Sequence, residues 1–547
     1  MQRFFDKLVI NVKKSLYILL ALMLCAVNAT AQVTSVKADN DWALDVEMQG
    51  SFSNSKTPLW LNANKYGISS LNSQNGYIRG IGAWDKNFDV NKSGVVNGNR
   101  IINLNAGLDI IVPIGYKSQG YKEHYTNHFV LQQAFAELNY KLGTLTVGSK
   151  HQPMELKNNE LSSGSQTLGI NARPVPQVRI GLNDYWNIPG TKKWVAVKAH
   201  MAYGMMTDGG WEETFVSGSG NKYNKNTRYH QKAGYLKIGK EEVFPLTLTI
   251  GLEMASQFGG YMYKYNSKTK SYTETKVRCN FNTYWHAFTG TGAEEKEEGS
   301  EYQNAEGNHL GSWVMRLNWK AKTWEAGFYM DHYFEDHSSM FLLDYDGYGT
   351  GSDWNKKVDS RYFRYDLKDY LMGFDVKLKN FKYLNQAVVE YMTTRYQCGP
   401  IYHDHTKGIS DHICGKDGYY NHSSMPGWQH YGQFIGNPLY MSPIYNEDGY
   451  IGPRCNRFKA WHFGIAGDPM CGLHYRAKLS WQKGWGTYGA PYTDPRENTS
   501  LLLEAGYKFP EKSIFYGFTA SMAYGADWGE LRGNNSGMQF TVLYHVH

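Results

Sequence analysis

The sequence lacks the long apolar segments by which helical membrane proteins cross a bilayer. After Val27, no stretch approaches the ~20 consecutive apolar residues that a membrane helix requires. Hydrophobic residues make up 41% of the chain, and the mean hydropathy is −0.54. These values exclude insertion by helices. They leave insertion by β-strands open, because a barrel strand is apolar only on its lipid-facing side.

The sequence also lacks the motifs of common enzymes and metal sites. There is no G-x-S-x-G nucleophile motif and no phosphate-binding glycine loop before a helical pattern. His403-Asp-His405, with His412 and Cys414, matches no closed metal-binding spacing. We therefore expect no metal, no cofactor and no catalysis.

Neither charge nor cysteine content identifies a partner. The formal charge is +7, and the first 31 residues carry four basic residues and one acidic residue, so the remainder is nearly balanced. A clustered basic face is missing, which predicts no nucleic-acid partner. After Cys25, the cysteines are odd in number, so at least one thiol is free or pairs elsewhere, although Cys398 and Cys414 could close a loop. They are Cys279, Cys398, Cys414, Cys455 and Cys471.

The N-terminal segment has the features of a secretory signal. Basic residues precede an apolar run, residues 15–27, and Ala29-Thr30-Ala31 supplies the small residues of a cleavage site. Residues 1–31 are therefore predicted to be a signal peptide, with the mature chain starting at Gln32. A lipoprotein signal ending at Cys25 is the alternative, but bulky Leu24 argues against it.

Alternating strands dominate the rest of the chain. Leu246–Met254 has Leu, Ile and Met on one face and Thr and Glu on the other, and Met538–His547 ends the chain in the same pattern. The 42 Tyr, 16 Trp and 57 Gly suit the aromatic girdles and turns of a barrel. A large secreted β-protein would share this composition, so the pattern alone leaves both folds open.

The lengths of the connections favour a barrel. Short links, such as Gly239–Pro245 and Lys320–Thr323, alternate with long ones, as periplasmic turns alternate with external loops. The long links are Asp208–Arg228, Asn280–His309, Glu335–Ser360 and Gln397–His430. We predict an all-β fold, in which residues 32–547 form a transmembrane antiparallel barrel of about 18 strands. It would lie in the outer membrane of a Gram-negative bacterium, with the long links exposed at the cell surface.

One segment has no strand partner in this scheme. Residues 151–176 are rich in Ser, Gly and Asn and end in Ala172-Arg-Pro-Val-Pro176. Polar backbone at membrane depth is tolerated only where protein or water surrounds it. We predict that this segment folds inward and lines or plugs the lumen; a surface loop is the alternative.

Five stretches resemble the Wzi family of capsule-assembly proteins, two of them in the form found in Bacteroidetes-type bacteria. They are Pro58–Gly67, the hairpin Leu131–Leu138 with Val147–Lys150, Leu161–Ser165 leading to Asn171–Gln177, Tyr431–Leu439 and Phe463–Met470. The resemblance implies an outer-membrane barrel with a small helical plug, internal or periplasmic. It also implies a lectin-like protein that attaches polysaccharide without catalysing a reaction. One departure is His547, which stands where most barrels end in an aromatic residue.

A lectin requires aromatic faces for sugar C–H groups and planar polar groups for hydroxyls. The predicted external links contain both kinds of side chain. The candidates are Trp211, Tyr345, Tyr348, Trp354, Arg361, Tyr419, Tyr420, Asn421, Trp428 and His430. The alternative is that these aromatics only pack the loops against one another.

Four charged residues are candidates for lining the lumen. Glu155 and Glu160 could act as the carboxyl pair of a glycoside hydrolase, but we expect them to pair with Arg173 or Arg179 instead.

The leading interpretation is a lectin that anchors capsular or related exopolysaccharide. Outer-membrane lipid and the barrel assembly machinery are its other expected partners. The alternatives are a substrate-selective channel and a membrane-embedded glycan or lipid hydrolase.

Overall fold

The computed structural model describes residues 40–87, 102–115, 129–208, 210–290, 307–335, 351–353, 356, 369–402, 413–416 and 418–546. The predicted signal peptide lies outside these ranges, as do the candidate residues Tyr345, Tyr348, Trp354 and Arg361. No helix among the described residues has the length and apolarity to cross a membrane.

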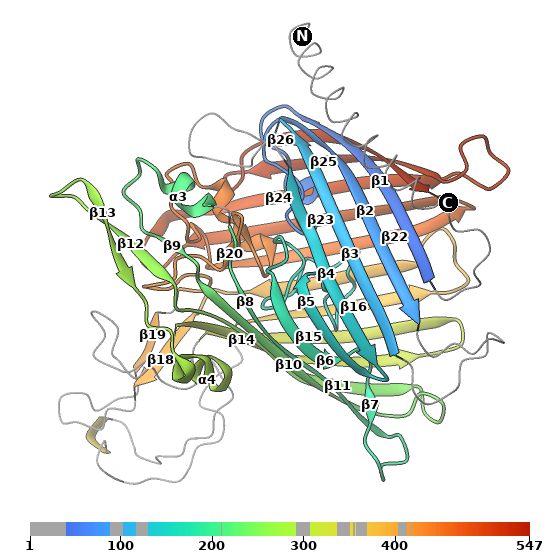
Figure 1. Ribbon diagram of the computed structural model, residues 1–547, viewed down its shortest axis with the longest axis horizontal. Helices are drawn as coiled ribbons and strands as arrows, with labels where there is room; N and C mark the ends of the chain where they lie inside the picture. The colour runs from blue at the N-terminus through green and yellow to red at the C-terminus, as the bar shows by residue number, and fades with distance from the viewer. Residues whose placement is uncertain are drawn as a thin grey trace, which may run out of the picture.

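Eighteen antiparallel strands form a closed barrel (Figure 1). They are β1 (Asn40–Ser53), β2 (Gln74–Asn87), β3 (Ile102–Ile114), β4 (Val130–Tyr140), β5 (Gly143–Ser149), β6 (Gln177–Leu182), β8 (Val195–Met205), β10 (Arg228–Ile238), β11 (Leu246–Phe258), β14 (Asn308–Lys320), β15 (Trp324–Glu335), β16 (Tyr370–Leu378), β17 (Gln386–Thr393), β22 (Phe458–Met470), β23 (Leu473–Gly486), β24 (Pro491–Lys508), β25 (Phe518–Gly529) and β26 (Asn535–Val546). A two-residue strand, β7 (Trp186–Asn187), extends the pairing of β8 beyond β6.

The first and last strands close the barrel. β1 pairs with β2 on one side and with β26 on the other, from Leu44 opposite Val546 to Ser53 opposite Gly537. Each barrel strand therefore has two partners, and no edge is left unpaired. The predicted fold class and strand number are confirmed.

The strands present apolar side chains outward and polar ones inward. On β11, Thr247, Thr249 and Glu253 are buried, whereas Ile250 is 41% exposed. The same outward exposure recurs around the wall at Leu108, Leu138, Ile180, Met201, Leu317, Phe328, Phe374, Phe463, Leu479, Leu503, Met522 and Phe540. A soluble β-protein would bury its apolar faces, so this arrangement suits a bilayer.

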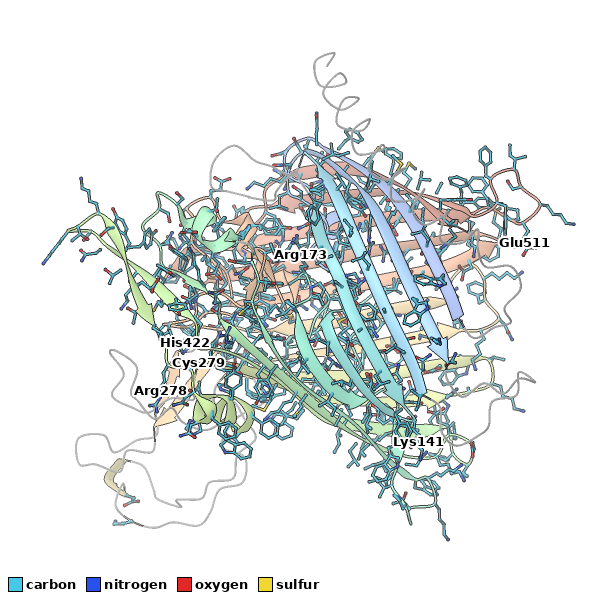
Figure 2. The ribbon with its side chains drawn as sticks, in the orientation of Figure 1. Lys141, Arg173, Arg278, Cys279, His422 and Glu511 are labelled. Carbon is cyan, nitrogen blue, oxygen red and sulfur yellow. The ribbon has the colours of Figure 1, made fainter. Side chains whose placement is uncertain are left out.

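Short and long connections separate to opposite ends of the barrel. Lys141 and Glu511, in short turns, lie at the end that includes the C-terminus, whereas Arg278, Cys279 and His422 lie at the other (Figure 2). We name this second end the outer end. It bears α3 (Trp211–Val216), β9 (Tyr223–Lys225), β12 (Tyr261–Asn266), β13 (Ser271–Lys276), α4 (Phe281–Thr289), the 3-10 turn η1 (Gly351–Asp353), β18 (Cys398–Tyr402) and β19 (Ile413–Lys416).

Three segments form a plug inside the barrel: residues 54–73, 150–176 and 418–457. They contain α2 (Leu59–Asn62), β20 (Gln429–His430), β21 (Gln433–Phe434) and the 3-10 turns η2 (Pro438–Tyr440) and η3 (Pro443–Tyr445). A helical plug was expected, but its only α-helix within the described residues has four residues. Side chains of the plug and wall satisfy much of its backbone, so regular helix is not required.

We predict that an arginine on the outer face is tolerated only away from the bilayer centre. Ile250→Arg should lower the free energy of unfolding in lipid vesicles by about 2–4 kcal/mol, because Ile250 faces hydrocarbon near the middle of β11. Val243→Arg, in an exposed turn, should change it by less than about 1 kcal/mol. Urea unfolding in vesicles measures both. Equal costs at the two sites would contradict the assignment of the lipid-facing surface.

Candidate functional site

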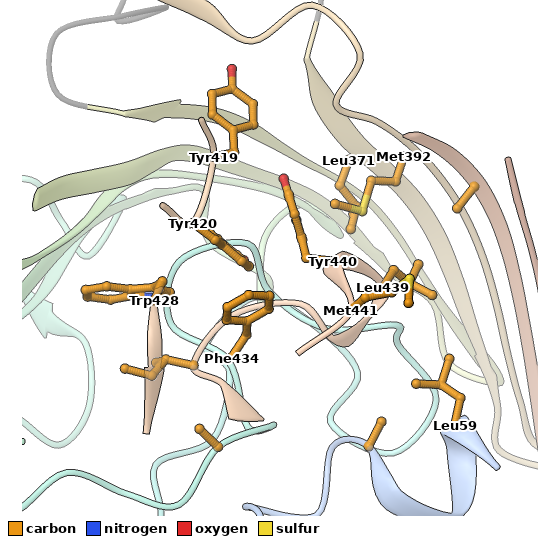
Figure 3. Packing of buried hydrophobic residues seen from close by; sticks show 14 of the residues in the cluster. Leu59, Leu371, Met392, Tyr419, Tyr420, Trp428, Phe434, Leu439, Tyr440 and Met441 are labelled. Carbon is orange, nitrogen blue, oxygen red and sulfur yellow. The ribbon is translucent and has the colours of Figure 1, made fainter. Parts of the chain in front are cut away.

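An aromatic core holds the plug segments together. Trp428, Tyr420, Tyr440 and Phe434 are fully buried and belong to one cluster (Figure 3). Trp60, 1% exposed, belongs to the same cluster. The rings of Tyr420 and Tyr440 lie 4.0 Å apart, centre to centre. Wall residues, including Leu371 and Met392, complete the cluster. The lumen at this level is therefore a packed interior.

A carboxylate on the wall anchors residues 150–176. Glu390, on β17, accepts a hydrogen bond from the Ser162 hydroxyl (2.6 Å) and another from the Ser163 N–H (2.8 Å). It also accepts one from the hydroxyl of Tyr329 on β15. Opposing hydrogen bonds from plug and wall thus converge on one buried group, which compensates for its removal from water.

Further wall groups hold the plug from other directions. Lys157 forms a buried ion pair with Asp331 on β15, and Thr167 and Ser312, on β14, share a hydrogen bond of 2.8 Å. Ser165 donates to Glu253 on β11 (3.3 Å). The Leu59 N–H at the start of α2 donates to Asp527 on β25 (3.0 Å). The sequence pattern placed Glu253 on a polar face but did not indicate its plug partner.

Four predicted sugar-binding residues lie in the plug. Tyr419, Tyr420, Trp428 and His430 were expected in an external loop, but all are at most 1% exposed. The physical reason is that their chain segment turns back into the lumen, where these rings pack on wall and plug residues. None of the four has a free face for a sugar in this structure.

His430 joins the plug to the outer connection between β8 and β10. Its Nδ1 donates to the Arg173 carbonyl (2.8 Å), and its Nε2 accepts from the Thr207 N–H (3.2 Å). Burial lowers the pKa of His430 to about 4. A neutral imidazole, with one donor and one acceptor, satisfies both contacts.

Two other predicted sugar-binding residues lie at the outer end. Trp211 is 2% exposed and stacks on Phe215 at 4.5 Å, so it also packs in a core. Asn421 belongs to the plug segment 418–457, beside His422 where this segment reaches the outer end, and is partly exposed.

The predicted lumen residues separate into two groups. Glu155, Arg173 and Arg179 line a cavity of about 80 Å³ between the plug and strands β6, β8, β10 and β11. Glu155 pairs with Lys198 on β8 (2.8 Å) rather than with an arginine. The Arg173 guanidinium lies 3.7 Å from the centre of the Tyr431 ring.

Glu160 lies elsewhere, 2.6 Å from His474 on β23. Gln386, on β17, also donates to it (3.3 Å). The two glutamates are thus held by different parts of the wall. This arrangement offers no support for a carboxyl pair acting across one glycosidic bond.

The outer end has a group of arginine–aromatic stacks, which we name the outer rim. The guanidinium carbons lie 3.9 to 4.3 Å from the ring centres. The pairs are Arg395 with Trp485, Arg454 with Tyr450, Arg457 with Tyr488 and Arg496 with Tyr492. Local sequence pattern did not reveal two of these pairs, because Arg395 and Trp485, and Arg457 and Tyr488, are more than 30 residues apart. Arg–Tyr pairs four residues apart, as in 450/454 and 492/496, were the only local signal.

The outer rim has charges available for a ligand. Arg454 pairs with Asp448. Within the described part of the chain, no carboxylate lies at ion-pair distance from Arg395, Arg457 or Arg496. Planar guanidinium groups held on aromatic rings are suited to paired hydrogen bonds with hydroxyls or carboxylates.

Comparisons with known proteins identify no family. No protein-family profile and no curated protein matches the chain. Among solved structures, it is similar to Wzi of Escherichia coli, an outer-membrane protein involved in group 1 capsule assembly and described as a carbohydrate-binding β-barrel. That match has 11% identity and a TM-score of 0.49, and covers 91% of this chain and 83% of Wzi.

Outer-membrane proteins of other bacteria give similar matches. OccAB4 of Acinetobacter baumannii has 8% identity, a TM-score of 0.44 and coverage of 94% of this chain and 100% of that one. OccK2 (OpdF) of Pseudomonas aeruginosa, solved with glucuronate, has 9% identity, a TM-score of 0.44 and coverage of 93% and 98%. At these identities the likenesses concern the fold, and none assigns a function to this chain.

We predict that Glu390 is essential to plug attachment. Glu390→Ala should lower the free energy of unfolding by about 3 kcal/mol, because it leaves the donors of Ser162, Ser163 and Tyr329 without an acceptor. It should also expose residues 150–176 to protease. Urea unfolding in detergent and limited proteolysis measure these effects. Glu497→Ala, which removes an exposed pair with Lys483, is the control and should cost less than about 1 kcal/mol; a similar loss in both variants would contradict the anchoring role.

Proposed function

We propose that this protein is a plugged outer-membrane barrel that holds an exported, capsule-like polysaccharide at the cell surface without catalysing a reaction. The observation that carries the proposal is the aromatic core across the lumen, where Trp60, Tyr420, Trp428 and Tyr440 are buried. A packed lumen suits attachment better than passage. The lack of a facing carboxylate pair at Glu155 and Glu160 agrees with a non-enzymatic role.

The outer rim is our proposed polysaccharide-binding surface. Its aromatic rings offer faces for sugar C–H groups, and its guanidinium groups offer donors for hydroxyls or carboxylates. Asn421, partly exposed near Tyr450, could add an amide. The proposal also keeps Tyr345, Tyr348, Trp354 and Arg361, which lie outside the described residues. Weak single contacts suffice, because a long polymer binds through many repeats and many barrels.

Membership of the Wzi family is part of this proposal. Its support is the order of the five motifs along the chain, several of which contribute to one structural unit. Pro58–Gly67, Leu161–Gln177 and Tyr431–Leu439 contribute to the plug. These three motifs thus coincide with the part of the fold that distinguishes a plugged barrel from an open one, whereas the other two lie in the wall strands β4, β5 and β22.

A substrate-selective channel is the second candidate. The observation that favours it is the cavity beside the plug, which is lined by Glu155, Arg173 and Arg179. Charged groups around a constriction can select solutes. The two functions differ in whether ions cross the resting barrel.

We predict that the purified protein does not conduct in planar bilayers. The wild type should show no regular current steps, because side chains of β11, β14, β15, β17 and β25 anchor its plug. Glu390→Ala should show brief openings as residues 150–176 loosen. Steady wild-type steps of defined size would favour the channel.

We predict that the outer rim retains polymer on the cell. In the native host, deletion of the gene should release intact polysaccharide into the medium, and the wild-type gene should restore attachment. Arg457→Ala with Tyr488→Ala should lower affinity for the isolated polymer by about tenfold, because one stacked donor pair is lost. Staining of cell-attached and released polymer, together with binding to the purified barrel, measures both effects.

The matched control for this experiment is Lys512→Ala with Tyr516→Ala, a basic and aromatic pair at the opposite end of the barrel. It should leave attachment unchanged. Loss of polymer synthesis on deletion, or equal effects of the two double variants, would contradict the proposal.

A further inference from the structure

Helix α4 lies on the outside of the barrel wall. The Tyr203 hydroxyl donates to the Tyr284 carbonyl (2.9 Å), and the Phe258 and Tyr284 rings meet at 5.1 Å. Phe288 lies 5.8 Å from His230, ring centre to ring centre. Tyr203, His230 and Phe258 alternate with the inward side chains of β8, β10 and β11, so they face outward. The helix therefore covers the outer face beside the apolar belt.

The face of α4 that points away from the barrel carries two large aromatic side chains beside the polar Asn282 and Thr289. Thr283 and Ala287 are buried against the wall, whereas Phe281 is 84% exposed and Trp285 is 57% exposed. These aromatics lie one helical turn apart on the free face. A helix with apolar groups on both faces is suited to an apolar or interfacial environment on its second side. This environment would be continuous with the lipid that contacts the belt.

An apolar groove runs across the wall strands from the C-terminal end of α4, where Phe288 lines it. Its floor is formed by Ala199 and Gly234, which are paired across β8 and β10. A side chain added at Gly234 would meet no atom within 4 Å, so the groove is open at this point. Its sides and roof are Leu138, Leu145, Ile180, Met201, Leu252 and Phe288.

A lysine lies at the outer end of this groove. Lys232 is two residues from Gly234 along β10, and its ammonium donates to the Phe288 carbonyl near the end of α4. It also lies 4.5 Å from the centre of the Phe288 ring. An ammonium has three N–H donors. The helix carbonyl uses one of them, which leaves donors for an anionic group at the mouth of the groove.

We propose that α4 and this groove form a binding site for an outer-leaflet lipid with a phosphate-bearing headgroup. One acyl chain lies on the floor formed by Ala199 and Gly234, and Lys232 contacts the phosphate. Phe281 and Trp285 lie in the interfacial region beside the lipid. Continuity with the lipid-facing belt, apolar lining and one cation at the outer end all match this occupant. The site is independent of polysaccharide binding at the outer rim.

Lipid retention tests the groove. The full mature barrel is equilibrated with phosphatidylglycerol in detergent, and native mass spectrometry counts the lipids that remain bound. The wild type should retain one lipid. The affinity of Gly234→Val for this lipid should be about tenfold lower, because the valine side chain fills the groove. Gly80→Val, at another outward and open glycine, is the matched control and should behave like the wild type. Equal retention by the wild type and Gly234→Val would overturn the proposal.

The same measurement tests the lysine. Lys232→Met should remove the preference for phosphatidylglycerol over phosphatidylcholine, a change of about tenfold. Lys268→Met, in the exposed turn between β12 and β13, should preserve that preference. A preference that survives Lys232→Met would overturn the assignment of the phosphate contact.

Trp285 reports what the helix contacts. In vesicles, the fluorescence lost on Trp285→Phe gives the contribution of this residue. Phosphatidylcholine with brominated acyl chains should quench that contribution at least twofold more than aqueous iodide does, as expected for an interfacial tryptophan. Quenching by iodide alone would show that α4 faces water, where a sugar or a protein could bind, and would overturn the lipid assignment.

Discussion

A closed sheet with hydrocarbon on its outer face is the constraint on which this structure depends. Hydrocarbon offers no hydrogen bonds, so each strand must have two partners, and β1 with β26 supplies the last pair. Irregular chain is then admissible only where the barrel shields it. The same constraint explains why Ile250 is exposed while Glu253, three residues along β11, is buried. The wall thus separates the hydrocarbon outside from a polar interior, and the plug lies in that interior.

The polar groups that line the interior of the barrel are largely carboxylates of the wall strands. Glu390, Asp331, Glu253 and Asp527 face donors of the plug, so they determine where an irregular segment can lie without losing hydrogen bonds. The aromatic cluster fills the space among these contacts. An 18-strand wall is wide enough to require such filling. With polar contacts at the wall and an apolar centre, the plug is packed like the core of a small globular domain.

Local pattern was enough to predict the wall but not the path of the plug. The predicted strand at Leu246–Met254 agrees with β11, because alternation is a property of neighbouring residues. Tyr420 instead has a distant partner: its hydroxyl donates a hydrogen bond to the carbonyl of Gln166, 254 residues away in the sequence. An aromatic segment has the same composition in a lumen and on a surface. Its burial, like the pairing of Arg395 with Trp485, depends on distant partners that periodicity does not reveal.

The outer end separates two kinds of contact. The arginine–aromatic stacks lie near β17 and β22–β24, whereas α4 and its groove lie over β8, β10 and β11. The stacks provide several charged groups but no apolar groove, whereas the groove on the other strands is apolar and has a single charged residue, Lys232. An apolar surface such as Gly234 beside Ala199 does not stabilise a bound hydrated polysaccharide. Guanidinium groups likewise do not stabilise a bound acyl chain. Under the two proposals, opposite chemistry on separate strands keeps polymer binding and lipid binding from competing.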